Sequence, residues 1–168
     1  MTKSEDMLCT AQMKSEENKY TVLFVCTGNT CRSPMAEALF NHLYNDGTRH
    51  ARSAGLAAYS DPISENAKDA LMERGVLPTP DNDYVNHLSK RLDADMLEKA
   101  DLVVGLTSSH AMSIMMAYPA YASKIAVMPR DISDPYGGSA DDYWRTLNDI
   151  EESLKEAFGR DGHVTWED

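Results

Sequence analysis

Residues 21–34 read TVLFVCTGNTCRSP, which joins a strand pattern to the start of a helix. The run over 21–25 is β-branched and aromatic, as is typical of a buried parallel strand. The Gly-Asn pair that follows indicates a turn. Ser33-Pro34 indicates a helix start, because serine caps helices and proline suits the first helical position. This order of strand, loop and helix predicts an α/β fold.

The rest of the chain continues the alternation of strands and helices. Apolar runs predict further strands over 51–56, 102–106 and 125–128. Helical spacing and capping residues predict helices over 33–43, 64–74, 92–100 and 108–118, with 76–86 as loop and a last long helix that carries Tyr143, Leu147, Ile150 and Leu154 on one face. This alternation predicts a three-layer α/β sandwich, in which a four-stranded parallel sheet is flanked by helices. Ligands bind beyond the carboxyl ends of such strands, where the loops after Val25 and Met128 lie.

Length and composition favour one globular domain. The chain has 168 residues, of which 42% are hydrophobic and 26% are charged. Residues 1–19 are polar and without periodicity, so we expect a flexible leader, a single domain over 20–160 and a tail over 161–168. The N-terminus is too polar for a signal peptide and no apolar run reaches membrane-spanning length, which predicts a cytoplasmic protein without a membrane partner.

Charge and cysteine content exclude several classes of protein. A net charge of −11 disfavours nucleic acid as a partner, and it means that an anionic substrate needs a local positive pocket. Three cysteines (Cys9, Cys26 and Cys31) are too few for a disulfide framework and favour a reducing compartment. Without a Cys-x-x-Cys motif or paired histidines, we expect no metal and no cofactor, and we expect a monomer.

The loop over 26–33 has the features of a phosphate site. Its backbone N–H groups and the positive end of the following helix point to one place, Gly28 permits a turn that a side chain would obstruct, and Arg32 offers a fork of donors for two oxygens. The same field stabilises a thiolate at Cys26, to which Ser33 can add a hydrogen bond. Cys26 then attacks phosphorus, and water hydrolyses the cysteinyl-phosphate. The alternative is a buried structural cysteine beside a surface arginine. The predicted substrate-binding residues of this loop are Thr27, Gly28, Asn29, Thr30, Cys31 and Ser33.

A second loop supplies a candidate proton donor. Asp134 precedes a proline in DPYGG (134–138), and Tyr136 is a candidate wall of the pocket. Asp131 is a rival donor, and a plain turn is the alternative reading of the whole segment. An isolated histidine such as His87 is more often structural. Cys31 is either a small packed residue or an oxidation partner of Cys26.

These residues together resemble a known family. The segment VLFVCTGNTCRSPMAE (22–37) resembles the signature of the low-molecular-weight protein tyrosine phosphatases, and the motifs SAG (53–55) and DPYGGS (134–139) match further family segments in the same order, so that the resemblance covers about 20–158. The resemblance implies a four-stranded parallel sheet and the following roles: Cys26 as nucleophile, Arg32 as phosphate clamp, Asp134 as general acid, His87 as support for Asn29, and Cys31 as a residue that traps Cys26 in a reversible disulfide.

One position bears on the substrate. The tyrosine phosphatases usually carry an aliphatic residue before the second loop cysteine, whereas Thr30 resembles the bacterial protein-arginine phosphatases, which implies phosphoarginine in phosphorylated proteins. Threonine is smaller than isoleucine and adds a hydroxyl, and Gly137 replaces a second aromatic residue. Phosphotyrosine stays as the alternative. Arsenate reduction is disfavoured because no cysteine follows Cys31. A non-catalytic phosphoprotein-binding or redox-sensing module need not keep a thiol, Arg32 and Asp134 together.

Overall fold

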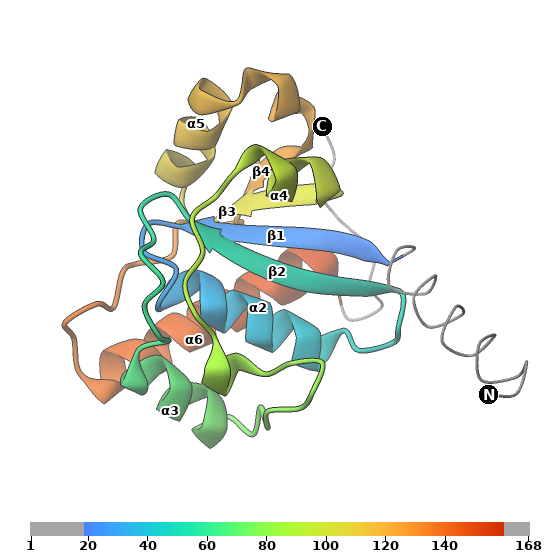
Figure 1. The fold of residues 1–168 in the computed structure, drawn as a ribbon. Helices are drawn as coiled ribbons and strands as arrows, with labels where there is room; N and C mark the ends of the chain where they lie inside the picture. The colour runs from blue at the N-terminus through green and yellow to red at the C-terminus, as the bar shows by residue number, and fades with distance from the viewer. Residues whose placement is uncertain (1–18, 160–168) are drawn as a thin grey trace, which may run out of the picture.

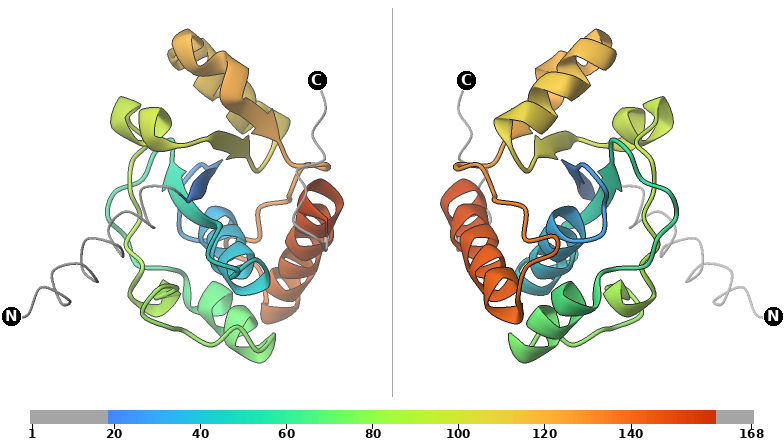
Figure 2. Two further views of the ribbon diagram at one scale, coloured as in Figure 1. Left: turned by 90° about the vertical axis from the view of Figure 1, so that its right-hand side faces the viewer. Right: turned by 90° about the vertical axis from the view of Figure 1, so that its left-hand side faces the viewer.

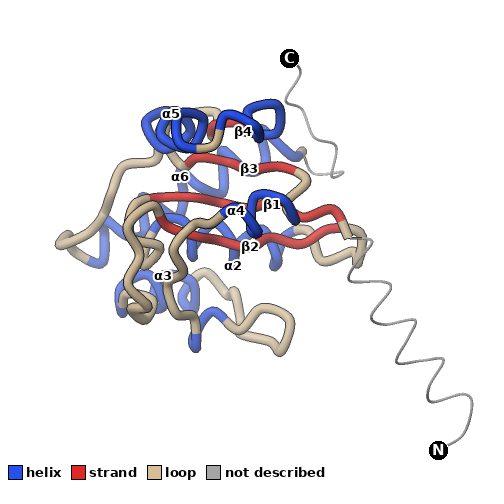
Figure 3. Tube along the Cα trace, turned by 45° about the horizontal axis from the view of Figure 1, so that its top comes forward, coloured by secondary structure: helices blue, strands red, loops and turns tan. Residues whose placement is uncertain are grey.

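The computed structural model describes residues 19–159, which form a three-layer α/β sandwich (Figure 1). Four parallel strands make the central sheet in the order β2-β1-β3-β4. Figure 3 shows the strands side by side. Their bounds are β1 (Tyr20–Cys26), β2 (Arg49–Gly55), β3 (Leu102–Gly105) and β4 (Ile125–Val127). The predicted fold class is confirmed, whereas Cys9, most of the expected leader and the expected tail lie outside the described residues.

Helices cover both faces of the sheet (Figures 1 and 2). One face carries α2 (Arg32–Leu43), α3 (Glu65–Glu73), α6 (Ala140–Phe158) and the short turn η1 (Tyr84–Asn86). The other face carries α4 (Ala94–Lys99), α5 (Ser108–Ala117) and the turn η2 (Pro119–Lys124). Within residues 19–159, none of the helices combines the length and the hydrophobicity that crossing a membrane requires.

Strand β1 lies in the middle of the sheet and supplies both cores. Successive side chains of a strand point to opposite faces. Val22 and Phe24 therefore join the cluster under α2, α3 and α6, and Leu23 and Val25 join the cluster under α4 and α5. Burial on both faces explains why this strand reads as a continuous apolar run. The four predicted core positions of the last helix are all buried: Tyr143, Leu147, Ile150 and Leu154.

The start of α2 differs from the prediction. The helix begins at Arg32, and its cap position, Cys31, makes no side-chain capping hydrogen bond. Ser33 and Pro34 lie inside the first turn, so the prediction that Ser33 caps the helix is wrong. The physical reason is that the Ser33 hydroxyl lies 2.9 Å from the sulfur of Cys26 instead.

Other boundaries shift by one or two residues. Strand β2 begins two residues earlier than predicted, α4 is shorter than predicted, and the predicted loop over 76–86 contains the turn η1. Gly75 ends α3 as expected: its φ is +88°, and its N–H and that of Val76 donate back to the carbonyls of Met72 and Leu71. Because all four strands are parallel, the loops that follow them lie at one edge of the sheet (Figure 1).

Candidate active site

Three loops enclose one pocket at the carboxyl edge of the sheet. The pocket has a volume of about 280 Å³. Its floor is the loop from Cys26 to Arg32 between β1 and α2. Ala57 and Asp61 reach it from the loop after β2, and Asp134 and Tyr136 from the loop before α6. Segments about a hundred residues apart in the sequence therefore share one site.

The Cys26 thiol lies at the bottom of the pocket among hydrogen-bond donors. The Ser33 hydroxyl is 2.9 Å from its sulfur, and the backbone N–H of Asn29 donates to the same sulfur at 3.3 Å. The N-terminus of α2 begins only a few residues later, so its positive end acts on the same atom. These contacts stabilise negative charge on sulfur, which is what a thiolate nucleophile requires.

Asn29 holds the loop in shape. It is fully buried with a left-handed φ of +57°. Its side-chain NH₂ donates to the Ser33 hydroxyl at 2.7 Å, and its side-chain oxygen accepts from the backbone N–H of Lys90 at 3.0 Å. His87 Nε2 donates to the Asn29 carbonyl at 2.8 Å, and burial lowers the pKa of this histidine. Asn29 and His87 therefore hold the shape of the loop, Asn29 as part of the pocket lining and His87 from outside it.

The glycine expected to shape the loop is not the one that the geometry demands. Gly28 lacks a left-handed φ, and a Cβ there would meet only the Thr30 hydroxyl, at 3.7 Å, so the expectation that a side chain would obstruct the turn is wrong. Gly55 at the end of β2 is the constrained position. A Cβ on Gly55 would lie 2.6 Å from the Thr27 carbonyl and 3.0 Å from the Cβ of Asn29. Glycine there lets β2 approach the loop.

Arg32 and Asp134 lie together at the pocket. Arg32 is buried, its Nη1 donates to the Ile132 carbonyl at 3.0 Å, and its Nη2 lies 3.6 Å from Oδ2 of Asp134. The other carboxylate oxygen of Asp134 accepts from the backbone N–H of Tyr136 at 3.1 Å. The hydrogen bond to the Ile132 carbonyl thus holds the Arg32 guanidinium in place, and the hydrogen bond from the Tyr136 N–H orients the Asp134 carboxylate.

Asp131, the rival proton donor, is engaged elsewhere. Its two oxygens accept from the backbone N–H and the hydroxyl of Ser108, at 2.8 and 3.1 Å, where α5 begins. It does not belong to the pocket lining, whereas Asp134 does. Of these two aspartates, Asp134 is therefore the one that lines the pocket.

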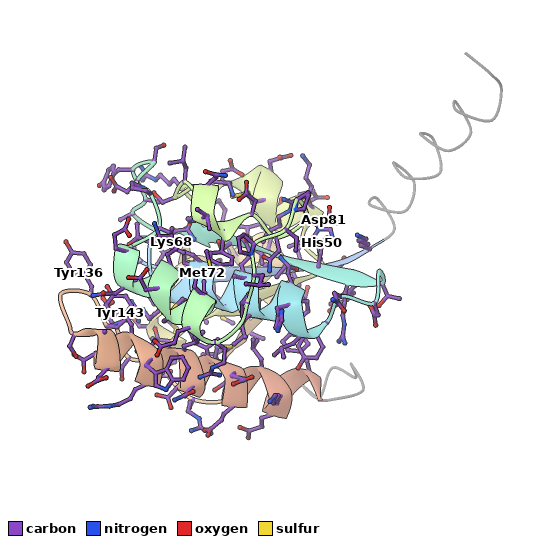
Figure 4. The ribbon with its side chains drawn as sticks, turned by 90° about the horizontal axis from the view of Figure 1, so that it is seen from below. His50, Lys68, Met72, Asp81, Tyr136 and Tyr143 are labelled. Carbon is purple, nitrogen blue, oxygen red and sulfur yellow. The ribbon has the colours of Figure 1, made fainter. Side chains whose placement is uncertain are left out.

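Tyr136 and Thr30 line the same pocket. Tyr136 is 78% exposed, so its side chain is accessible to a ligand. Figure 4 shows Tyr136 on the loop that leads into α6, at the same end of the molecule as Tyr143. The Thr30 hydroxyl lies 3.7 Å from the sulfur of Cys31. Thr30 thus brings a hydroxyl, and Tyr136 an aromatic ring, to the same pocket.

Cys31 is buried behind the loop and faces α6. Its sulfur lies 3.3 Å from the Tyr143 hydroxyl and 3.6 Å from the Ser64 hydroxyl. Burial is the main reason that the pKa of Tyr143 rises to about 12. Cys26 and Cys31 are both free thiols. The structure thus shows the packed, reduced form of Cys31.

Sequence reasoning missed several residues of this site. Asp61 and Ala57 line the pocket, Tyr143 contacts Cys31, and His110 contacts Thr27 at 2.9 Å. His110 lies in the first turn of the helix that follows β3. Its place after a parallel strand is the signal that would have directed attention to it, because such positions face the ligand edge of the sheet.

Comparison with known proteins agrees with this geometry. A family model described as low molecular weight phosphotyrosine protein phosphatase matches residues 21–161. A protein-arginine-phosphatase of Bacillus subtilis is 37% identical over 145 residues, an alignment that covers 80% of this chain and 92% of the relative. Arsenate reductase 2 of Bacillus cereus is 35% identical over 139 residues and covers 83% of this chain and 94% of the relative.

Solved structures agree as well. The YwlE arginine phosphatase, in a mutant with a phosphorylated active-site serine, superposes with a TM-score of 0.73 at 35% identity, over 81% of this chain and 91% of that one. The family model and these relatives each span about four fifths of the chain or more, and the residues that the family model matches include all three loops of the pocket. The chain belongs to the low molecular weight phosphotyrosine protein phosphatase family.

Proposed function

We propose that this protein is a phosphatase that removes phosphoryl groups from protein side chains through Cys26. The observation that carries the proposal is that Cys26, Arg32 and Asp134 line one pocket at the N-terminus of α2. A thiol with donors on its sulfur, a buried guanidinium fork and a carboxylate are the three groups that a two-step phosphoryl transfer needs. A purely binding or redox-sensing module would not need all three.

In the first step the phosphoryl oxygens accept hydrogen bonds from the loop N–H groups and from Arg32. The Cys26 thiolate attacks phosphorus, the S–P bond forms, and the bond from phosphorus to the leaving group breaks. Asp134, protonated at this point, gives its proton to the leaving group. The negative charge that was on sulfur moves to the phosphoryl group and the leaving group, where the loop and the proton neutralise it.

In the second step water attacks the cysteinyl-phosphate. Asp134, now a carboxylate, takes a proton from the water, the S–P bond breaks and inorganic phosphate forms. The sulfur leaves as a thiolate, and its contacts with Ser33 and the Asn29 N–H stabilise it again. Asp134 keeps the proton that it took from water, so the site is back in its starting state once phosphate leaves.

For the substrate we propose phosphoarginine in proteins. Thr30 lines the pocket, and a threonine is more polar and smaller than the aliphatic residue of the tyrosine phosphatases. Asp61 and Asp134 add two carboxylates to the walls, which favours the cationic guanidinium over a neutral phenol. The name of the Bacillus subtilis relative agrees with this choice. Tyr136 can stack on either leaving group, so it does not discriminate.

Arsenate reduction is not proposed, although relatives bear that name. Reduction of arsenate by thiols needs cysteines that pass electrons to one another, and the sequence has none after Cys31. A cytoplasmic location and a monomeric single domain fit the proposed activity, because a reactive thiolate is preserved in a reducing compartment.

The test compares phosphate release from a protein phosphorylated on arginine with release from one phosphorylated on tyrosine. We expect kcat/KM for the arginine-phosphorylated protein to be the larger, and we expect no release by the Cys26→Ser variant. Absence of release from both substrates contradicts the phosphatase proposal. A larger kcat/KM for the tyrosine-phosphorylated protein contradicts the choice of phosphoarginine only.

A further inference from the structure

A buried histidine lies directly behind the loop that holds the nucleophile. His110 is 6% exposed in the first turn of α5, and it does not line the pocket. Its Nε2 atom is 2.9 Å from the hydroxyl oxygen of Thr27, the residue next to Cys26. Its Nδ1 atom is 3.0 Å from the hydroxyl oxygen of Thr107. Both ring nitrogens therefore have a hydroxyl partner, which simple packing in an apolar core does not require.

The effect of His110 on Thr27 depends on which ring nitrogen carries the proton. Burial and the charge of Arg32 lower the pKa of His110 to about 4, so the ring is neutral at physiological pH and carries one N–H. The Thr107 hydroxyl oxygen already accepts the backbone N–H of His110 at 3.2 Å as the helix cap. When the Thr107 hydroxyl gives its own hydrogen to Nδ1, the ring N–H is on Nε2 and donates to Thr27.

This proton arrangement changes what Thr27 offers to a ligand. Its oxygen accepts from His110, so its hydroxyl hydrogen is not used by the ring and is available to the pocket, which Thr27 lines. We propose that His110 is a positioning residue that makes the Thr27 hydroxyl a hydrogen-bond donor to the bound phosphoryl group. The inference rests on the proposed function, since it assigns a further donor to the same anion site.

The surroundings of His110 favour this role over that of a proton carrier. Three charged groups act on the ring: Arg32 from α2, and Asp134 and Asp131 from the loop before α6. The ring meets the pocket only through Thr27, because it lines no part of the cavity itself. His110 thus acts on substrate through a hydroxyl and leaves proton transfer to Asp134.

Binding of inorganic phosphate, measured by titration calorimetry, tests the inference without any turnover. We expect Thr27→Val and His110→Phe each to weaken phosphate binding by about tenfold, the scale of one hydrogen bond to a charged group. The double variant should bind no more weakly than either single variant, because both remove the same donor. Thr27→Ser keeps the hydroxyl and should therefore lose less phosphate affinity than Thr27→Val.

Two substitutions at His110 separate positioning from simple packing. His110→Gln places an amide NH₂ near the position of Nε2 and should restore phosphate binding, whereas His110→Asn reaches only the position of Nδ1 and should not. Thermal unfolding shows that each variant is folded. Additive losses in the double variant, or unchanged phosphate affinity in Thr27→Val, overturn the inference. Wild-type protein that binds phosphate but hydrolyses no phosphorylated protein contradicts the proposed function instead.

Discussion

Asp134 carries the proton chemistry of the proposed mechanism, so its loss should affect rate far more than binding. We expect Asp134→Asn to lower kcat by about 10²- to 10⁴-fold, the usual contribution of a general acid. Phosphate affinity should change little, since the loop and Arg32 supply most of the binding. Stopped-flow measurement of the first turnover checks the loss of rate, and calorimetry checks the phosphate affinity.

Asp131→Asn is the matched control for this variant. Asp131 binds Ser108 at the start of α5 and does not line the pocket. We expect the kcat of Asp131→Asn to stay within a few-fold of the wild-type value and its thermal stability to fall slightly. A normal rate of Cys26 phosphorylation in Asp134→Asn would remove Asp134 from the mechanism.

Thr30 should set the preference between phosphoarginine and phosphotyrosine. Thr30→Ile adds apolar volume to the pocket and removes a hydroxyl, so the ratio of kcat/KM for arginine-phosphorylated over tyrosine-phosphorylated protein should fall about tenfold or more. Thr79→Ile, in an exposed turn, makes the same change far from the pocket and should leave the ratio unchanged. An unaltered ratio in Thr30→Ile would show that this side chain does not select the substrate.

Asp61 adds a negative charge to the pocket wall, and this charge should attract a cationic leaving group. Asp61 lies on the loop after β2, whereas Asp134 lies on the loop before α6, and both line the pocket. We expect Asp61→Asn to lower kcat/KM for phosphoarginine about two- to fivefold, the scale of one exposed charge pair, with no loss for phosphotyrosine. Asp81→Asn removes the same charge at the end of the molecule away from Tyr136 (Figure 4) and should change neither value. Equal losses on both substrates would contradict a role for the Asp61 charge.

At the scale of elements, the fit between β2 and the loop after β1 decides whether the site forms. Gly55→Ala would place a Cβ 2.6 Å from the Thr27 carbonyl, so the loop must move. We expect lower thermal stability together with weaker phosphate binding. Gly47→Ala is the control: its φ of +85° is also left-handed, but a Cβ there meets nothing within 4 Å, so it should lower stability without altering phosphate binding. Normal phosphate affinity in Gly55→Ala would show that the loop keeps its shape without this contact.

Helices and strands could be predicted from the sequence where a local pattern of residues determines them. The strand over 21–25 and the core face of α6 follow from the spacing of apolar residues, and Gly75 follows from the chemistry of helix ends. The prediction that Ser33 caps the helix was wrong because its hydroxyl contacts the sulfur of Cys26 instead of a backbone N–H of the helix. His110 was missed because its partner Thr27 is 83 residues away, and no local pattern reports a contact across the sheet.

The whole molecule should lose stability as the solution becomes mildly acidic. Burial lowers the pKa of His87 and lowers that of His110 to about 4, from an ordinary value of 6.5. Between about pH 6.5 and pH 4 the unfolded chain therefore binds more protons than the folded one, so the free energy of unfolding falls as pH falls. Urea unfolding at a series of pH values measures this slope.

Two histidine variants test whether His110 causes the pH dependence of the free energy of unfolding. His110→Gln cannot bind a proton there and should flatten the dependence between pH 6.5 and pH 4, whereas His42→Gln, at an exposed position, should leave it unchanged. Equal slopes in wild type and His110→Gln would mean that His110 titrates alike in the folded and unfolded states.

Across the whole molecule, the fold brings Cys26 and Asp134, which lie far apart in the sequence, into one pocket, where in the proposed mechanism they transfer a phosphoryl group. The deciding measurement is rapid quenching of the wild-type protein during turnover of an arginine-phosphorylated protein, followed by mass spectrometry of its peptides. We predict one phosphoryl group on the peptide that contains Cys26, and none when Cys26 is replaced by alanine. Phosphoryl transfer to another residue, or phosphate release that survives the loss of Cys26, would contradict the proposed mechanism.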